Sequence, residues 1–292
     1  MQTAVSFSLQ TSRFRVQEQI LSKNNLCETF CETSLKISTR CGILFLWRKS
    51  YPFLTRREAS CVNLACFVAS LGYKTLLVDF DPQANATSAL GVFDKKIENS
   101  IYDALCAKDA TRCVRHGKYV DFIPSSRDLA GAELELANEE DREYVLSGAL
   151  EPLKDEYDFV FIDCAPSINL TLINALCASS GVIVPLQCEY FALEGLNQLL
   201  NTVRLVKTNL NPNLRLEGIL LTMCAQTKLS REVECKVRDT FKDKVFETTI
   251  PRNVRLAEAP GFGMTILEFD KSCSGAKAYE KLAKEYISKF KE

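Results

Sequence analysis

Two runs of apolar residues that each end in a carboxylate constrain the fold of this chain more than any other feature. Residues 75–81 read T-L-L-V-D-F-D, and residues 158–163 read D-F-V-F-I-D. A strand that is apolar throughout, rather than at alternate positions, is buried on both faces and is typical of a parallel sheet. Ligands of open parallel sheets bind outside the carboxyl ends of the strands. The acids that end these runs therefore mark a candidate site.

The rest of the chain alternates between helical and strand patterns. Such alternation indicates right-handed βαβ units. We therefore predict one doubly wound α/β domain over residues 41–292, with a mostly parallel sheet flanked by helices. Further strands are predicted at 41–47, 119–124, 181–186, 216–223, 244–249 and 264–269. Helices are predicted at 60–71, 100–106, 128–138, 140–153, 170–178, 192–207, 230–241 and 275–290.

Composition excludes a disordered, a collagen-like and a membrane-spanning chain. The chain has 292 residues, 47% of them hydrophobic and 25% charged, with 36 Lys and Arg against 37 Asp and Glu. Apolar runs of about seven residues are too short to span a bilayer, which takes roughly 18 or more. The 13 cysteines are scattered, so we interpret them as reduced thiols rather than a disulfide framework. The spacing of Cys27, Cys31 and Cys41 matches no zinc-ligand pattern.

The first 60 residues differ from the remainder. They hold nine basic and four acidic residues, and Gly42 is the only one of the 12 glycines before residue 61. The opening is rich in Ser and Thr and has no acid before Glu18, which resembles an organelle transit peptide. We expect residues 1–40 to be an aberrant or disordered extension, with a targeting segment as the alternative.

Asp79, Asp81 and Asp163 all fall at predicted strand ends. Carboxylates that converge at one edge need a cation or hydrogen-bond donors to stay ionised. Magnesium bound together with a phosphate suits this chemistry, because Mg²⁺ takes one or two carboxylates along with phosphate oxygens and waters. The alternative is that each Asp caps the turn after its strand. Three acids in this arrangement favour a metal–phosphate site.

Four longer motifs resemble the ParA/Soj partition ATPases, relatives of MinD within the deviant Walker P-loop NTPases. Residues 79–87 read D-F-D-P-Q-A-N-A-T, and residues 161–167, F-I-D-C-A-P-S, are similar to a Walker B and switch region. Further matches are Q-C-E-Y-F-A-L-E-G-L at 187–196 and I-P-R-N-V-R-L-A-E-A-P at 250–260. The resemblance extends from about residue 60 to the end.

The resemblance implies roles for individual residues. Asp81 positions or activates the attacking water, while Asp79 and Asp163 hold Mg²⁺, mostly through waters. Pro251 and Asn253 border the adenine of ATP. The cofactor expected from the family is therefore Mg-ATP, bound between two copies of the chain in a homodimer.

The same resemblance implies partners. These are non-specific DNA and a ParB-like centromere-binding protein, in a cytoplasmic, nucleoid-associated setting. Arg255 is expected to contact DNA phosphates. The family's other DNA-binding Arg aligns with Gln226, which weakens that prediction, although Lys228 and Arg231 lie close by in sequence. The alternative for this basic group is an ordinary solvated helix face.

The phosphate loop of the family is not recognisable. The family pattern K-G-G-x-G-K-T-T runs into a helix that begins like C-V-N-L-A at 61–65, which places the loop at 52–59. This chain has P-F-L-T-R-R-E-A there, with Arg57 at the Walker lysine position and Glu58 at the position of the Mg²⁺-binding hydroxyl. Phosphate loops need glycines for unusual dihedrals and close backbone approach. We therefore expect ATP binding and hydrolysis to be impaired.

Two origins fit this loss: a reading-frame error or decayed gene start, or a genuine non-hydrolysing paralogue. Three functions stay open. The first is a partition ATPase lineage for a chromosome or plasmid. The second is a non-enzymatic module that keeps the fold and the partner surfaces. The third is a MinD-like membrane ATPase, because the helix predicted at 275–290 has an apolar face and a Lys-rich face.

Overall fold

The structure, a computed structural model, describes residues 43–46, 60–94, 97–165, 167–189 and 192–290. These residues all lie in the compact unit Thr39–Glu292. The predicted extension at 1–40 and the phosphate-loop position at 52–59 lie outside the described residues.

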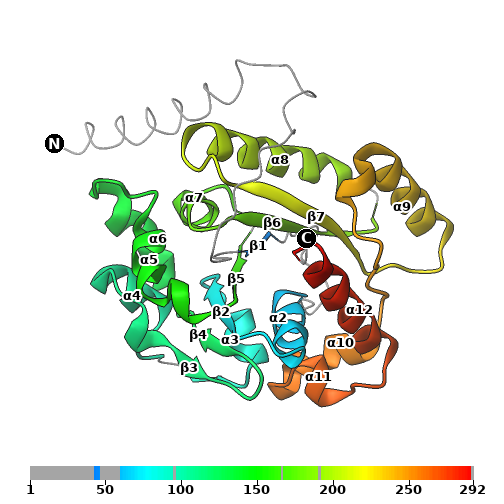
Figure 1. The fold of residues 1–292 in the computed structure, drawn as a ribbon, viewed down its shortest axis with the longest axis horizontal. Helices are drawn as coiled ribbons and strands as arrows, with labels where there is room; N and C mark the ends of the chain where they lie inside the picture. Colours follow the sequence, from blue (N-terminus) through cyan, green and yellow to red (C-terminus); the bar gives the residue numbers. More distant parts are fainter. Residues whose placement is uncertain (1–42, 47–59, 95–96, 166, 190–191, 291–292) are drawn as a thin grey trace, which may run out of the picture. The chain divides into compact units, whose positions relative to one another are not determined.

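A seven-stranded sheet organises the described residues (Figure 1), with strand order β3-β4-β2-β5-β1-β6-β7. The strand pairs are parallel except for β3 with β4. The strands are β1 Ile43–Leu46, β2 Thr75–Phe80, β3 Arg115–His116, β4 Asp121–Ile123, β5 Phe159–Cys164, β6 Gly181–Gln187 and β7 Arg215–Thr222. The predicted strand at 41–47 is confirmed as β1, between β5 and β6.

Helices connect most of these strands, as predicted for a doubly wound fold. They are α2 Ser60–Ser70, α3 Asn85–Ala89, α4 Ile101–Ala107, α5 Leu129–Glu135, α6 Val145–Leu150, α7 Leu170–Cys177, α8 Ala192–Asn209, α9 Lys228–Phe241, α10 Val254–Glu258, α11 Ile266–Phe269 and α12 Ser274–Ser288.

The sheet separates two hydrophobic clusters, one on each face. Along β2, Leu76 and Val78 belong to the first cluster and Leu77 to the second. This alternation follows from the strand geometry, in which successive side chains point to opposite faces. All six residues of β2 are buried, as the apolar run predicted for a strand covered on both sides.

Helices α2 and α12 lie side by side against the second cluster (Figure 1). Tyr279, Leu282 and Tyr286 of α12 are fully buried, and the rings of Phe159 and Phe161 on β5 lie about 6 Å from the Tyr286 ring. The apolar face of the C-terminal helix is therefore part of the core. Within the part of the chain that the structure describes, no helix is long and apolar enough to cross a membrane.

The prediction of a strand at 244–249 was wrong. This segment runs beside β7 as an isolated bridge between Val245 and Ile219, in which the Phe246 N–H donates to the Ile219 carbonyl at 3.0 Å, and it forms no continuous ladder. The backbone N–H groups of Glu247 and Thr248 donate instead to the Glu285 carboxylate of α12, at 2.7 and 2.9 Å. A side chain therefore satisfies donors that a strand would have used in a ladder.

The prediction of a strand at 264–269 was also wrong, because residues 266–269 form helix α11. Thr265 and Glu268 form a capping box at its start, in which the Glu268 carboxylate accepts from the Thr265 backbone N–H at 3.3 Å. The spacing of Thr three residues before Glu is a helix-start signal. That signal was present in the sequence and outweighed the apolar pattern.

Candidate functional site

The predicted acids meet at the carboxyl edge of the sheet. Asp79 on β2 and Asp163 on β5 are direct partners in the parallel register, and Phe45 of β1 pairs with Asp163 on the other side. Asp81 follows one residue after β2 ends. The structure therefore brings the three acids to one edge, where β1 also ends.

Helix α2 begins beside the same acids. Its Cys61 thiol is buried, and this burial, followed by the charges of Asp163 and Asp79, raises the pKa of Cys61 well above its ordinary value. The Ser60 hydroxyl lies 2.7 Å from the Tyr279 hydroxyl, which joins the start of α2 to α12. The end of β1 and the start of α2 therefore both lie near the acids.

Asp79 is held entirely by protein donors. Its Oδ2 accepts from the Thr87 backbone N–H at 2.7 Å and from the Thr87 hydroxyl at 2.6 Å, while its Oδ1 accepts from the Asp81 N–H at 3.2 Å. Burial raises the pKa of Asp79 to about 6, against the effect of these hydrogen bonds. The contacts indicate that Asp79 fixes the loop carrying Asp81.

Thr87 is the functional residue that the sequence reasoning missed. Besides donating to Asp79, its hydroxyl oxygen accepts from the Ser125 backbone N–H at 2.9 Å, which joins α3 to the segment after β4. The residue lies within the D-F-D-P-Q-A-N-A-T motif, and the motif was its only signal. The motif shows that the position matters, but not that its partner is the first Asp.

Asp81 lies at the start of a tight turn. Its carboxylate accepts from the Gln83 N–H at 2.9 Å, and its carbonyl accepts from the Ala84 N–H at 2.8 Å. Ala84 then adopts a left-handed conformation, with φ of 50°, before α3 begins. Asp81 is 9% exposed, so its side chain lies at the rim of the buried site.

Three buried polar atoms at this edge have no hydrogen-bond partner among the described residues. They are Nδ2 of Asn85, at the start of α3, Oγ of Ser125, which follows β4, and Oγ1 of Thr222, the last residue of β7. Buried donors are normally paired, so an unpaired one is explained by a ligand or water. Donors and carboxylates at one edge fit a metal–phosphate group. The residues at 52–59, with no glycine, do not.

Pro251 and Asn253 lie beside the end of β7. The Cys224 N–H donates to the Ile250 carbonyl, and Cys224 forms an isolated bridge with Pro251. Asn253 caps α10 through Oδ1, and its Nδ2 donates to the Ser274 hydroxyl at 2.8 Å. The segment predicted to border the base is therefore hydrogen-bonded to the carboxyl edge.

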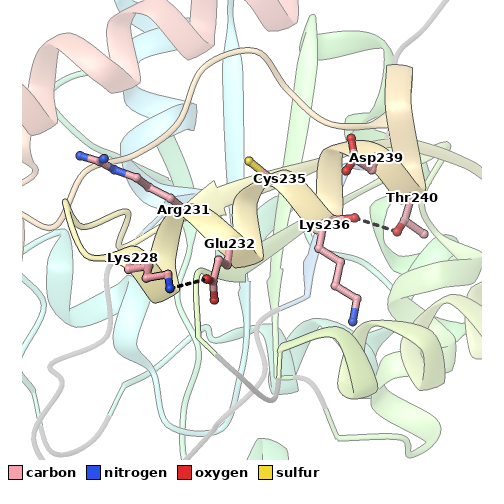
Figure 2. Close-up of a pocket in the computed structure, with 7 residues that line it drawn as sticks. All are labelled: Lys228, Arg231, Glu232, Cys235, Lys236, Asp239 and Thr240. Atoms are coloured by element: carbon pink, nitrogen blue, oxygen red, sulfur yellow. Dashed lines mark hydrogen bonds and ion pairs between the residues drawn. The ribbon is translucent and has the colours of Figure 1, made fainter.

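The predicted DNA-contacting cations differ in how they are held. Lys228 is 91% exposed and pairs with Glu232 at 3.7 Å, and the Arg231 guanidinium donates to the Gln226 side chain at 2.8 Å. Figure 2 shows both cations along α9, where they line a hollow with five other residues: Glu232, Cys235, Lys236, Asp239 and Thr240.

Arg255 on α10 is paired with two carboxylates, those of Glu258 at 3.2 Å and Asp270 at 3.7 Å. Its guanidinium also lies over the Phe269 ring. These contacts leave less of its charge for a phosphate than Lys228 offers.

Within the described ranges, no group of three or more His, Cys, Asp or Glu side chains could hold a metal ion. Cys27, Cys31 and Cys41 lie outside those ranges, as do Arg57 and Glu58. The predictions for these five residues stay predictions.

Comparison with known proteins identifies close relatives. A family described as an AAA domain matches residues 57–216. The chromosome partitioning protein ParA of Myxococcus xanthus is 45% identical over 237 residues, covering 80% of this chain and 84% of that protein. The sporulation initiation inhibitor protein Soj of Bacillus subtilis is 48% identical over 233 residues, covering 78% and 92%.

A solved structure supports the same assignment of fold. Cobyrinic acid a,c-diamide synthase from Mycobacterium smegmatis, solved with a bound ATP analog and magnesium, matches with a TM-score of 0.71 and 32% identity, covering 86% of this chain and 96% of that one.

Proposed function

The chain belongs to the AAA domain family that includes the ParA and Soj chromosome-partitioning proteins, and from this we propose that it is a ParA/Soj-like partitioning protein whose nucleotide chemistry is impaired. The observation that carries the proposal is the sheet edge at which Asp79 and Asp163 are register partners on neighbouring strands and Asp81 follows β2. The chain that carries this edge is 45–48% identical to named partitioning proteins. Chromosome and plasmid cargo both fit.

In this proposal Mg-ATP is the family cofactor, and Mg²⁺ neutralises phosphate charge when it is bound. Asp163, which is partly exposed, would face the metal. Asp81 would orient a water at the rim of the site. Asp79 would act mainly by fixing the Asp81 turn, because its carboxylate accepts from the Asp81 N–H and from the N–H and hydroxyl of Thr87.

The sequence at 52–59 works against this chemistry. Side chains at Phe53 and Leu54 would fill the space that glycines leave open for phosphate, and Pro52 has no backbone N–H. Glu58 adds a negative charge that repels phosphate. We infer that the chain binds Mg-ATP weakly and turns it over slowly or not at all.

A homodimer, non-specific DNA and a ParB-like protein are the partners of this proposal. Lys228, Arg231 and Arg255 would contact DNA phosphates, with no base readout, in a cytoplasmic, nucleoid-associated protein. For binding through phosphates, the logarithm of the binding constant falls linearly as the logarithm of the salt concentration rises. A titration of random duplex DNA at several salt concentrations tests this, and undetectable binding at low salt would contradict it.

A non-enzymatic ParA-like module is the second candidate function, favoured by the missing glycines at 52–59. It keeps the partner surfaces and binds DNA or a ParB-like protein without nucleotide control. Adding Mg-ATP to the DNA titration separates the two candidate functions. Tighter DNA binding with nucleotide favours the ATP-dependent partitioning protein, and unchanged DNA binding favours the non-enzymatic module.

A MinD-like membrane role is less well supported, because α12 buries Tyr279, Leu282 and Tyr286 in the core. Co-sedimentation with vesicles containing anionic lipid tests it, with no binding as the expected result.

A further inference from the structure

The thiols of Cys188 and Cys224 lie 3.4 Å apart, sulfur to sulfur, at the carboxyl edge of the sheet. Cys188 directly follows β6, and its backbone N–H donates to the carbonyl of Thr222, the last residue of β7. Cys224 lies two residues beyond Thr222. Since β6 and β7 are parallel neighbours, the two cysteines follow adjacent strand ends, and their sulfurs need to approach by less than 2 Å to form a bond of about 2.0 Å.

The backbone between β7 and Cys224 is turned sharply. Met223 has a φ of 53°, a left-handed conformation that a side-chain-bearing residue adopts at a cost. Its neighbour Cys224 is then held on both sides, since its N–H donates to Ile250 and its carbonyl accepts from Arg252, each at 3.0 Å. The short distance between the thiols is therefore set by fixed backbone on both strands.

The pKa values of the two thiols are shifted in opposite directions. The hydrogen bond between the two sulfurs lowers the pKa of Cys188 against the effect of its burial, and the Ser230 hydroxyl lowers it further. The same hydrogen bond, together with burial, raises the pKa of Cys224. Thiolate is the reactive form of cysteine, so Cys188 is the nucleophile of the pair. Cys224, which is half-buried, is the partner that can resolve an oxidised Cys188.

Among the described residues, the following cysteines differ from this pair. Burial raises the pKa of Cys66, Cys164 and Cys177, which keeps them as inert thiols in the core. Cys106 and Cys235 are exposed, each on its own helix surface.

We propose that Cys188 and Cys224 form a reversible disulfide when the protein meets a hydroperoxide. The Cys188 thiolate attacks the peroxide oxygen, which breaks the O–O bond and gives a sulfenic acid. With hydrogen peroxide, the leaving hydroxide takes up a proton to become water. Cys224 then attacks the sulfenic sulfur, forms the S–S bond and releases a second water. Two electrons pass from the two thiols to the peroxide, and a thiol reductant reverses the step.

The disulfide would tie the end of β6 to the end of β7, next to the segment at 250–253. Because Cys224 is hydrogen-bonded to Ile250 and Arg252, the cross-link would also restrain that segment. The idea that this segment borders a nucleotide base rests on the proposed function. Formation of the disulfide does not, so the test uses neither nucleotide nor DNA.

The test is disulfide mapping on the full chain. Reduced protein is treated with a small excess of hydrogen peroxide, blocked with iodoacetamide and digested with chymotrypsin under non-reducing conditions. The expected result is a peptide containing Cys188 joined to one containing Cys224, with a mass about 2 Da below the sum of the reduced peptides. Dithiothreitol should separate the two peptides.

Matched Cys→Ser variants test whether the cross-link needs both Cys188 and Cys224. Cys188→Ser and Cys224→Ser should each lose the cross-linked peptide, while Cys235→Ser, an exposed position on α9, should keep it. Mapping of the unsubstituted chain decides the matter even if a variant fails to fold. Sulfinic acid at Cys188 without a cross-link, or a cross-link between other cysteines, would overturn the proposal.

Discussion

Strands β1 and β2 end at the same edge of the sheet, but the sequences that follow them differ in which family residues they retain. After β2, residues 79–87 hold a closed set of hydrogen bonds among Asp79, Asp81 and Thr87. After β1, residues 52–59 contain no glycine and place Glu58 where the family has a hydroxyl. The β2 segment also stabilises the fold through its buried contacts, whereas a phosphate loop serves mainly the ligand. From this difference we expect the fold to persist in this chain even where its nucleotide chemistry is impaired.

The largest expected effect comes from rebuilding the segment after β1. Seven substitutions restore the family pattern while Thr55 is kept: Pro52→Lys, Phe53→Gly, Leu54→Gly, Arg56→Gly, Arg57→Lys, Glu58→Thr and Ala59→Thr. Mg-ATP affinity should rise by about 1,000-fold, or ~4 kcal/mol, because backbone donors and the lysine become available to phosphate. Isothermal titration calorimetry measures the change.

A matched control carries the same rebuilt loop with Arg57→Ala in place of Arg57→Lys. It should lose most of the gain, because the glycines remain but the charge that meets the phosphates is absent. If the chain with the rebuilt loop binds Mg-ATP no better than the natural chain, the residues at 52–59 are not what impairs nucleotide binding, and the contrast drawn with the segment after β2 is wrong.

The second prediction breaks the intact segment after β2. Asp79→Ala leaves the Thr87 hydroxyl and two buried backbone N–H groups without acceptors, so the free energy of unfolding should fall by about 3 kcal/mol. Urea denaturation measures the loss. Asp94→Ala, at an exposed position, serves as the control and should change stability by no more than about 0.5 kcal/mol.

The third prediction concerns the pH dependence of stability. Burial raises the pKa of Asp79 from 3.8 to about 6, so the folded chain binds this proton more tightly than the unfolded chain. Its contribution is complete below pH 4 and is lost as pH rises through 6, amounting to about 3 kcal/mol. Asp79→Asn should lack this component. Denaturation curves between pH 4 and 7, without Mg²⁺, measure it, and parallel pH profiles for the two proteins would refute it.

The smallest effects are expected for DNA binding by the surface cations, which lie outside the segments that follow β1 and β2. In the rebuilt-loop protein, Lys228→Ala with Arg231→Ala should weaken non-specific DNA binding by about 10-fold and reduce the salt slope by about 2. Arg255→Ala should cost less, because Glu258 and Asp270 already pair with it. Lys284→Ala on α12 is the control, and an equal loss there would show that the basic group on α9 is an ordinary solvated face.

Much of the fold followed from the sequence because burial leaves a pattern. The apolar runs predicted β2 and β5, and the acids that end them were correctly placed at one edge. The two wrong strands, at 244–249 and 264–269, failed where side chains rather than strand pairing satisfy the backbone: Glu285 in one case and the Thr265–Glu268 box in the other.

The site was less predictable than the fold. The sequence identifies three acids but not which of them is already paired with protein donors, because the partner of Asp79 depends on the turn at Ala84 and the position of Thr87. The Cys188–Cys224 pair likewise needed the register of β6 and β7, since 35 residues separate the two in the chain. Such contacts come from tertiary packing and leave no local pattern.

The most direct test of the account is a titration of Mg-ATP into the chain with its natural residues at 52–59, followed by a phosphate-release assay. We predict no measurable binding of Mg-ATP at micromolar protein concentration and no release of phosphate above the rate without protein. Micromolar affinity with turnover that Asp81→Ala abolishes would contradict it. That result would show that phosphate is bound in this chain without a glycine-rich loop.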